Sequence, residues 1–225
     1  MTTDPLPDNT PEEPDDVGGL GRWDPLTPAQ VYDVLKGLRV PWWIAGGWAI
    51  DVFVGRETRS HGDIDVGVLR RDQVVVQGAL EGWDLQAADP PGSLRPWRPR
   101  ETLPLSVHDI WCRPDGEAAW GLQLMLEESD GSKWFYRRNP GIVLPLASIV
   151  WRDDDGVPYL VPEVQLLYKA ARQSPANESD FEACLPLLDE EQRTWLGIAL
   201  VIAHPGHPWI ERLRPNVENV DTEDA

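Results

Sequence analysis

Cysteine is scarce in this sequence. Only Cys112 and Cys184 occur among 225 residues, and they lie far apart. Disulfide-stapled secreted domains need several cysteines, and structural zinc sites need cysteine and histidine ligands at short, regular spacing. The sequence therefore argues against a disulfide framework and against a zinc-binding fold. We expect both cysteines to be core residues.

Long apolar runs are also missing. The longest, around residues 197–203, falls well short of the roughly 20 residues that a membrane-spanning helix needs. Residues 1–16 are acidic and rich in proline, unlike a signal or transit peptide. We therefore expect a cytoplasmic protein with no membrane partner.

Positively charged residues are few compared with negatively charged ones. Lys and Arg total 20 against 38 Asp and Glu, which gives a formal net charge of −18. Nucleic acids are bound through Lys and Arg contacts to phosphates, so we expect no nucleic-acid partner. A cationic small-molecule substrate is compatible with this acidity, although solubility alone also explains it. Monomer and homodimer both stay open.

Composition divides the chain into four parts. Residues 1–24 form an acidic, proline-rich tail that we expect to be disordered, and residues 214–225 form a similar acidic tail. Helix and strand patterns alternate over residues 25–160, whereas residues 161–213 have helical patterns only. We predict an α/β (α+β) fold, in which a mixed β-sheet domain flanked by helices precedes a small helical C-terminal domain.

Capping signals and alternation predict the individual elements. Helices are expected to begin at Thr27, which starts a capping box with Pro28 at N1, and at Pro162. Ser179 and Asp189 start two more capping-box patterns. Alternating apolar residues predict the strands, and proline-rich residues 87–104 are expected to be irregular. The expected strands cover residues 42–45, 64–68, 106–112, 120–127 and 133–137.

A glycine pair and an acidic pair are the residues that indicate a functional site. Residues i and i+2 of a strand share a face, so Asp63 and Asp65 converge on one point. Two neighbouring carboxylates favour a bound cation, and their hard oxygens suit Mg²⁺. Gly46 and Gly47 separate a strand from a helix, where backbone N–H groups can approach a triphosphate. Each pair alone is usually a turn or a strand edge, but together they predict a phosphate and metal site.

The same stretch carries a family resemblance. Trp43-Ile44-Ala45-Gly46-Gly47-Trp48-Ala49-Ile50-Asp51, with Gly55-Arg56, Thr58-Arg59, His61 and Asp63-Ile64-Asp65, resembles the active-site segment of the aminoglycoside and lincosamide nucleotidyltransferases. That group belongs to the polymerase-β-like, minimal nucleotidyltransferase superfamily. The resemblance implies a nucleotidyltransferase-like domain. It also implies Mg²⁺-dependent transfer of a nucleoside monophosphate, from ATP or another NTP, to a hydroxyl of an aminoglycoside-like antibiotic.

The resemblance also implies roles for particular residues. Asp63 and Asp65 would bind the metal and act in catalysis, and Gly46 and Gly47 would contact the phosphates. Further candidates are Arg59, His61 and Lys169 for the nucleotide and Glu163 for a substrate amine. A loop-ordering ion pair, a solvated helix face or a helix-dipole acid are the structural alternatives for these residues.

The family's third carboxylate has no clear counterpart. It is expected on the strand at residues 121–126, where the polar residue is Gln123, an amide that cannot act as a base. Glu127 lies on the same face of that strand, and Asp109 lies on the preceding strand. The pattern does not decide among them. We assign Glu127 as the third catalytic acid, with Asp109 and Gln123 as substrate contacts.

Two other functions remain open. The amide at position 123 favours a catalytically impaired nucleotide-binding module with a regulatory role. A toxin-type nucleotidyltransferase that modifies a protein or a tRNA is the other alternative. The net charge of −18 argues against tRNA as its acceptor.

Overall fold

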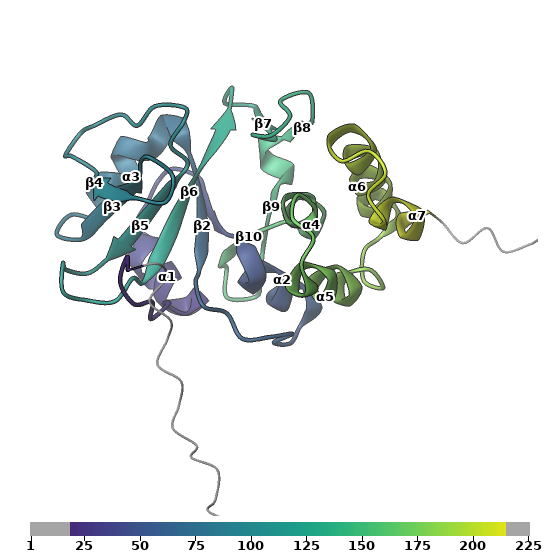
Figure 1. Cartoon of the computed structure of the whole chain (residues 1–225), viewed down its shortest axis with the longest axis horizontal. Helices are drawn as coiled ribbons and strands as arrows, with labels where there is room; N and C mark the ends of the chain where they lie inside the picture. Colours follow the sequence, from purple (N-terminus) through teal and green to yellow (C-terminus); the bar gives the residue numbers. More distant parts are fainter. Residues whose placement is uncertain (1–18, 215–225) are drawn as a thin grey trace, which may run out of the picture.

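The computed structural model describes residues 19–214, and the tails expected at the two ends fall largely outside them. Within this range one mixed sheet dominates (Figure 1). Its strands are β1 (Trp42–Ile44), β2 (Asp65–Leu69), β3 (Asp84–Ala88), β4 (Leu94–Pro96), β5 (Asp109–Arg113), β6 (Leu122–Ser129), β7 (Lys133–Phe135), β8 (Val143–Pro145), β9 (Val150–Arg152) and β10 (Pro158–Leu160).

Helices precede the first strand of the sheet, lie between its first strands and follow its last strand. They are α1 (Pro28–Leu35), α2 (Gly46–Val54), α3 (Gln73–Ala79), α4 (Pro162–Ala170), α5 (Pro175–Cys184), α6 (Glu190–Ala203) and α7 (Trp209–Leu213). No helix among residues 19–214 is both long enough and apolar enough to cross a bilayer. The mixed sheet with flanking helices and a helical C-terminal part confirms the predicted fold class.

The strand order places β2 at the centre of the sheet. The main path runs β4-β3-β5-β6-β2-β1-β10-β9, and β7 and β8 extend from β6. Strand β2 pairs in parallel with β6, opposing Asp65 to Gln123, and antiparallel with β1, opposing Gly67 to Trp43. The parallel β2–β6 pair requires a crossover, which α3 and strands β3 to β5 supply. This crossover brings the acidic pair beside the strand that carries Gln123 and Glu127.

The two faces of the sheet meet different surroundings. One face packs on α1 and α3 through a cluster that includes Val31, Leu35 and Val76 from the helices and Val66 and Leu124 from the strands. Because side chains alternate along a strand, Asp65, Gly67 and the neighbouring Gln123 lie on the opposite face. That second face is the one available for a functional site.

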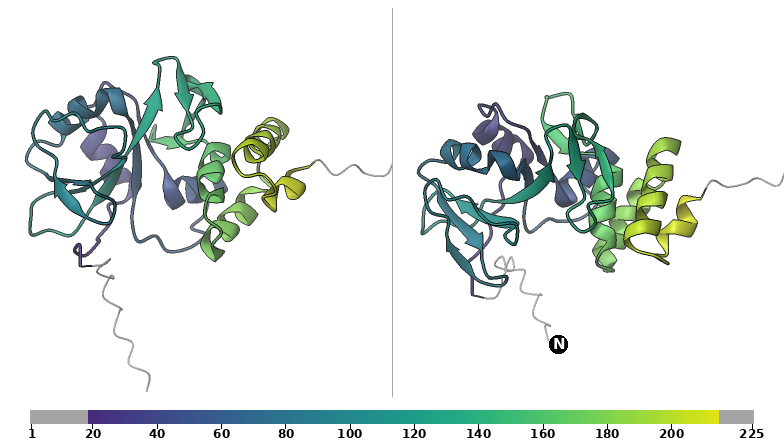
Figure 2. Two further views of the ribbon diagram at one scale, coloured as in Figure 1. Left: turned by 45° about the horizontal axis from the view of Figure 1, so that its top comes forward. Right: turned by 90° about the horizontal axis from the view of Figure 1, so that it is seen from above.

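The C-terminal helices pack against α2. In both views of Figure 2 the chain from α4 to α7 lies at one end of the molecule, away from β3 and β4. Helix α2 contacts both α4 and α5. A second apolar cluster joins Trp43 of β1 and Ile50 of α2 to Leu167 and Phe181 of the C-terminal helices. The division into domains at residues 160 and 161 stays a prediction.

Most local expectations agree with the structure, and two do not. The capping boxes at Thr27 and Asp189 are present, and Pro162 is the first residue of α4. The helix expected at Ser179 instead begins at Pro175 with Ser174 as its N-cap, because a proline at N1 and a serine hydroxyl form the stronger start. Residues 87–104 are not irregular throughout, since β4 pairs with β3.

Candidate functional site

A cleft with a volume of about 300 Å³ opens beside the first turn of α2. It lies between the second face of the sheet and the helices α4 and α5. The structure brings together in its lining seven of the residues singled out from the sequence. They are Gly46, Gly47, Arg59, Asp63, Asp65, Glu127 and Lys169.

Gly46 is required at its position for two reasons. Its φ of +71° lies in the left-handed region that side chains disfavour. A Cβ atom there would also lie 2.5 Å from Oδ2 of Asp65, a separation that real Cβ atoms do not adopt. The turn after β1 therefore lets the Asp65 carboxylate approach the backbone, and the acidic pair and the glycine pair form one site.

Gly47 is required by different neighbours. A Cβ atom there would collide with the ring of His61 and would lie 2.9 Å from Nη2 of Arg59. The His61 side chain is buried, and its Nε2 is 2.5 Å from Oδ2 of Asp51. His61 does not line the cleft. Its ring fixes the chain between α2 and β2 against the glycine turn.

The amide of Gly46 already has a partner. Its N–H donates to Oε1 of Gln165, a buried residue of α4, at 2.8 Å. The sequence predicted both glycine amides as phosphate contacts, but Gly46 makes this protein contact instead. The N-cap residue Ala45 makes no side-chain hydrogen bond, so the positive end of the α2 dipole faces the cleft without a capping carboxylate.

The acidic pair has the electrostatics of a cation site. Burial and the negative charge of Asp63 raise the pKa of Asp65 to about 7. A cation between the two carboxylates would remove that repulsion. Among residues 19–214 no cluster of three or more Asp, Glu, His or Cys side chains is placed to hold a metal. A metal at Asp63 and Asp65 would therefore complete its coordination with water and phosphate, which is the usual environment of Mg²⁺.

Four cationic side chains surround the rest of the cleft. Arg59 and Lys169 were predicted from the sequence, whereas Arg137 and Arg138 were not. Nη1 of Arg137 is buried without a hydrogen-bond partner, 3.8 Å from Oδ1 of Asp109, which also has none. So many cations in a chain with a net charge of −18 point to an anionic ligand. Two adjacent arginines after β7 were the signal available in the sequence.

Asp180 is a further residue that sequence reasoning missed. This aspartate of α5 is fully buried. Its carboxylate lies 2.6 Å from Nζ of Lys169 and accepts hydrogen bonds from Nε and Nη2 of Arg59, both at 3.3 Å. One carboxylate from the C-terminal helices thus holds two cations of the cleft.

Glu127 occupies the far end of the cleft. Its Oε2 accepts hydrogen bonds from Nε1 of Trp134 at 2.9 Å and from the hydroxyl of Tyr168 at 2.6 Å. Burial raises the pKa of this carboxyl group. Since Glu127 pairs with Leu69 while Gln123 pairs with Asp65, Glu127 lies four residues, or about 13 Å, further along the strands than Asp65. It is poorly placed to share a metal ion with Asp65.

The other candidates lie outside the cleft lining. Glu163 accepts a hydrogen bond from Gln192 of α6 at 3.0 Å, and burial raises its pKa to about 7. The amide of Gln123 donates to the sulfur of Met125 at 3.0 Å. Asp109 opposes Met125 across the β5–β6 pair and makes its closest charge contact with Arg137.

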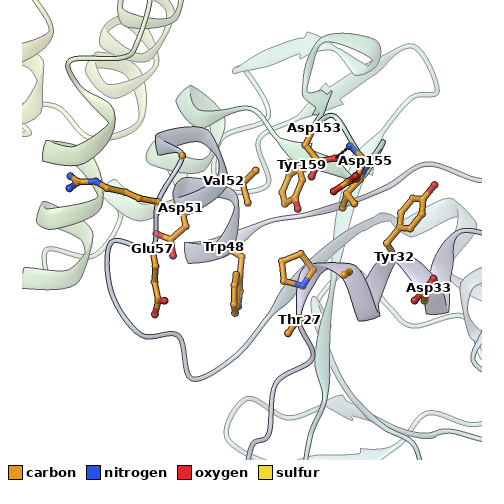
Figure 3. A pocket seen from close by; sticks show the side chains of 15 residues that line it. Thr27, Tyr32, Asp33, Trp48, Asp51, Val52, Glu57, Asp153, Asp155 and Tyr159 are labelled. Atoms are coloured by element: carbon orange, nitrogen blue, oxygen red, sulfur yellow. Dashed lines mark hydrogen bonds between the residues drawn. The ribbon is translucent and has the colours of Figure 1, made fainter.

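A larger hollow, of about 640 Å³, lies on another side of α2 (Figure 3). Residues of α1, of α2 and of the turn between β9 and β10 line it, among them Tyr32, Trp48 and Tyr159. It contains neither the glycine pair nor the acidic pair. Arg56 is the single Lys or Arg side chain among its described lining residues. The smaller cleft is therefore the better candidate for a phosphate site.

Part of the cleft lies in a stretch that is similar to known proteins. Residues 29–134 match the family model of aminoglycoside-2''-adenylyltransferase. Over 88 residues the chain is 28% identical to a lincosamide resistance protein of Staphylococcus haemolyticus, covering 38% of this chain and 54% of that protein. Over 27 residues it is 63% identical to a 2''-aminoglycoside nucleotidyltransferase of Escherichia coli, covering 12% of this chain and 15% of that protein. Over residues 29–134 the chain is therefore similar to the aminoglycoside and lincosamide nucleotidyltransferases.

This chain spans about half the length of the first of these relatives, and much less of the second. The solved structure of the lincosamide antibiotic adenylyltransferase LnuA, lincomycin-bound, is 19% identical with a TM-score of 0.49, covering 71% of this chain and 97% of that chain. ANT(2'')-Ia in complex with adenylyl-2''-tobramycin is 19% identical with a TM-score of 0.48, covering 76% and 95%. The family-model match includes the glycine pair, the acidic pair and Glu127, whereas Arg137, Lys169 and Asp180 lie beyond it.

Proposed function

We propose that this protein is a nucleotidyltransferase. It transfers a nucleoside monophosphate from ATP or another nucleoside triphosphate to a hydroxyl group of a small molecule. The supporting observation is the cleft that combines Asp63 and Asp65, the turn at Gly46 and Gly47, and four cationic side chains. Such a combination of carboxylates, helix N-terminus and cations suits a metal-bound triphosphate.

Different residues of the cleft are proposed to bind the metal, the phosphates and the leaving pyrophosphate. Asp63 and Asp65 would hold Mg²⁺, which would supply charge neutralisation at the phosphates. The first turn of α2, which includes the amide of Gly47, faces the phosphates with its positive end. Arg59 and Lys169 neutralise the charge that moves to the pyrophosphate as it leaves.

Glu127 is the proposed proton acceptor. It lies too far along the strands to share a metal with Asp65, but a phosphate and an acceptor hydroxyl fit between the two carboxylates. Burial raises its pKa, and this makes its carboxylate a stronger base than an exposed glutamate. Asp109 and Gln123, which share this face of the sheet, are proposed to contact the acceptor.

The acceptor class follows from the charge of the protein and from its relatives. An acidic chain with a carboxylate at the acceptor end of the cleft favours a cationic molecule that carries hydroxyl groups. The relatives are named for aminoglycosides or lincosamides, and both are antibiotic classes. We therefore place an aminoglycoside-like antibiotic first among the acceptors.

A transfer assay tests this proposal. The protein is incubated with Mg²⁺, labelled nucleoside triphosphates and a panel of aminoglycosides and lincosamides, and both pyrophosphate release and antibiotic labelling are measured. Asp63→Asn should lower turnover on the order of 100-fold or more, because a charge-stabilising group is lost. Asp154→Asn, which removes an equal charge from an exposed turn, should leave turnover unchanged. Equal turnover by Asp63→Asn and the wild type would refute the assignment.

A nucleotide-binding module without transferase activity is the second candidate. The amide of Gln123 beside Asp65, and the lack of a third metal-binding carboxylate among residues 19–214, favour it. Calorimetry with ATP and Mg²⁺ separates the two proposals. Binding of ATP without pyrophosphate release, across the whole acceptor panel, would favour the module.

A further inference from the structure

Asp180 is the most deeply buried charged side chain near the cleft, and it does not line the cleft. Its side chain has 0% exposure, whereas those of its partners Lys169 and Arg59 have 9% and 32%. Burying a carboxylate is unfavourable unless it is paired and hydrogen-bonded. Asp180 meets that requirement through the two cations, and both of them line the cleft.

The three residues come from three separate segments. Arg59 lies in the chain between α2 and β2, Lys169 in α4 and Asp180 in α5. Lys and Arg side chains have long, flexible stems that adopt many rotamers in solution. A shared carboxylate restricts both stems at once and keeps their charged ends at the cleft. The cluster retains a net positive charge, since two cations face one anion.

We propose that Asp180 is a positioning residue for the triphosphate, acting through Lys169 and Arg59. This inference rests on the proposed function, because it assumes that the cleft binds phosphates. Asp180 touches neither the phosphates nor the acceptor. It holds the two cations in the arrangement that the β- and γ-phosphates require.

If Asp180 acted only through its charge, its loss would change the affinity for anions in the opposite direction from the one that positioning predicts. If this carboxylate were only a nearby negative charge, removing it would strengthen the binding of an anion. If it positions the cations, removing it leaves Lys169 and Arg59 without their common partner, and anion binding weakens. The direction of the change in affinity therefore distinguishes positioning from bulk charge.

Inorganic tripolyphosphate is a suitable probe, because it carries the phosphates without base or sugar. Its dissociation constant is measured by calorimetry with Mg²⁺ for the wild type, Asp180→Asn and Glu182→Gln. Glu182 lies on the same helix, is exposed, and contacts Arg212. We expect Asp180→Asn to bind at least about 10-fold more weakly and Glu182→Gln to be unchanged. Equal or tighter binding by Asp180→Asn would overturn the proposal.

A double-mutant cycle guards against misfolding of the single variant. In Lys169→Gln/Asp180→Asn the two amides can hydrogen-bond to each other, and Arg59 is the one charged partner left at position 180. If Asp180 acts through Lys169, replacing it in the Lys169→Gln background should weaken binding by a smaller factor than in the wild type. An equal factor in both backgrounds contradicts the proposal. Thermal melts of all variants report folding.

Steady-state kinetics distinguishes positioning of the phosphates from a purely structural role, because a structural role would not change KM selectively. We expect Asp180→Asn to raise KM for the nucleoside triphosphate more than it lowers kcat, because the phosphates are bound less well. Tripolyphosphate binding by a wild type that transfers no nucleotide would refute the proposed function and leave the role of Asp180 intact. A wild type that binds no tripolyphosphate would refute both.

Discussion

The carboxylate of Asp65 lies directly against the α-carbon of Gly46. The two residues belong to neighbouring elements, the start of β2 and the first turn of α2, and a methyl group on Gly46 would meet Oδ2 at 2.5 Å. The Asp65 carboxylate therefore occupies the space that a side chain at position 46 would need. This contact joins the glycine turn to the acidic pair, so the proposed phosphate and metal contacts depend on the same packing.

Gly46→Ala should damage both stability and activity. The positive φ disfavours alanine by roughly 1–2 kcal/mol, and the added methyl group displaces the Asp65 carboxylate. We expect a lower melting temperature and a large loss of Mg²⁺-dependent transfer. Gly62→Ala is the matched control, because Gly62 has an ordinary φ and a methyl group added there would meet no other segment within 4 Å. Full activity in Gly46→Ala would contradict the contact.

The raised pKa of Asp65 predicts how stability depends on pH. Burial and Asp63 raise its pKa from the ordinary value of 3.8 to about 7 in the folded protein. Between these two values the folded state binds more protons than the unfolded state, so stability falls as pH rises toward 7 and stays lower above it. Mg²⁺ needs the deprotonated carboxylate, so its affinity should rise over the same range.

Thermal melts of the metal-free protein and of Asp65→Asn measure this contribution. The variant carries no titrating group at position 65, so its advantage over the wild type should grow from pH 5 to pH 8. Millimolar Mg²⁺ should stabilise the wild type at pH 8 and have little effect on the variant. A constant difference between the two proteins across this range would show that Asp65 does not titrate there.

Glu163 offers a second test, at the contact between α4 and α6. Burial raises its pKa to about 7, and Gln192 donates to its carboxylate. Glu163→Gln can keep that hydrogen bond and removes the buried charge. We expect the variant to melt higher than the wild type at pH 8, with the smallest difference at pH 5.

Turnover separates this structural role from a substrate contact. Because Glu163 does not line the cleft, Glu163→Gln should keep the wild-type KM for the acceptor. An acceptor KM that rises on the order of 10-fold or more would instead favour contact between Glu163 and a substrate amine.

Local signals in the sequence were sufficient for much of the fold and for one half of the site. The capping boxes at Thr27 and Asp189, the strand through Asp65 and the glycine turn depend on neighbours within a few residues. Such short-range chemistry is visible in one sequence. The alternation of residues 64–68 correctly placed Ile64 in the core and Asp65 on the opposite face.

The other half of the site depends on residues far apart in the chain. Gln165 is 119 positions from the Gly46 amide that it binds, and Asp180 is 121 positions from Arg59. No local pattern relates such pairs, because the packing of α4 and α5 against α2 brings them together. Arg137 was missed because its position beside Asp109 of β5 depends on the pairing of distant strands. Short strands such as β8 and β9 were also missed, since three residues carry too little alternation to be recognised.

Glu127 carries the last prediction. If it accepts the proton of the acceptor hydroxyl, Glu127→Gln should lower kcat on the order of 100-fold while the affinity for Mg²⁺ and nucleotide stays near that of the wild type. The register supports that separation, because Glu127 lies about 13 Å along the strands from Asp65. Tyr168→Phe is the control, since it removes one hydrogen bond to Oε2 and keeps the carboxylate. A loss of metal affinity in Glu127→Gln would mean that the carboxylate reaches the metal, and unchanged kcat would leave Asp109 as the carboxylate to replace next.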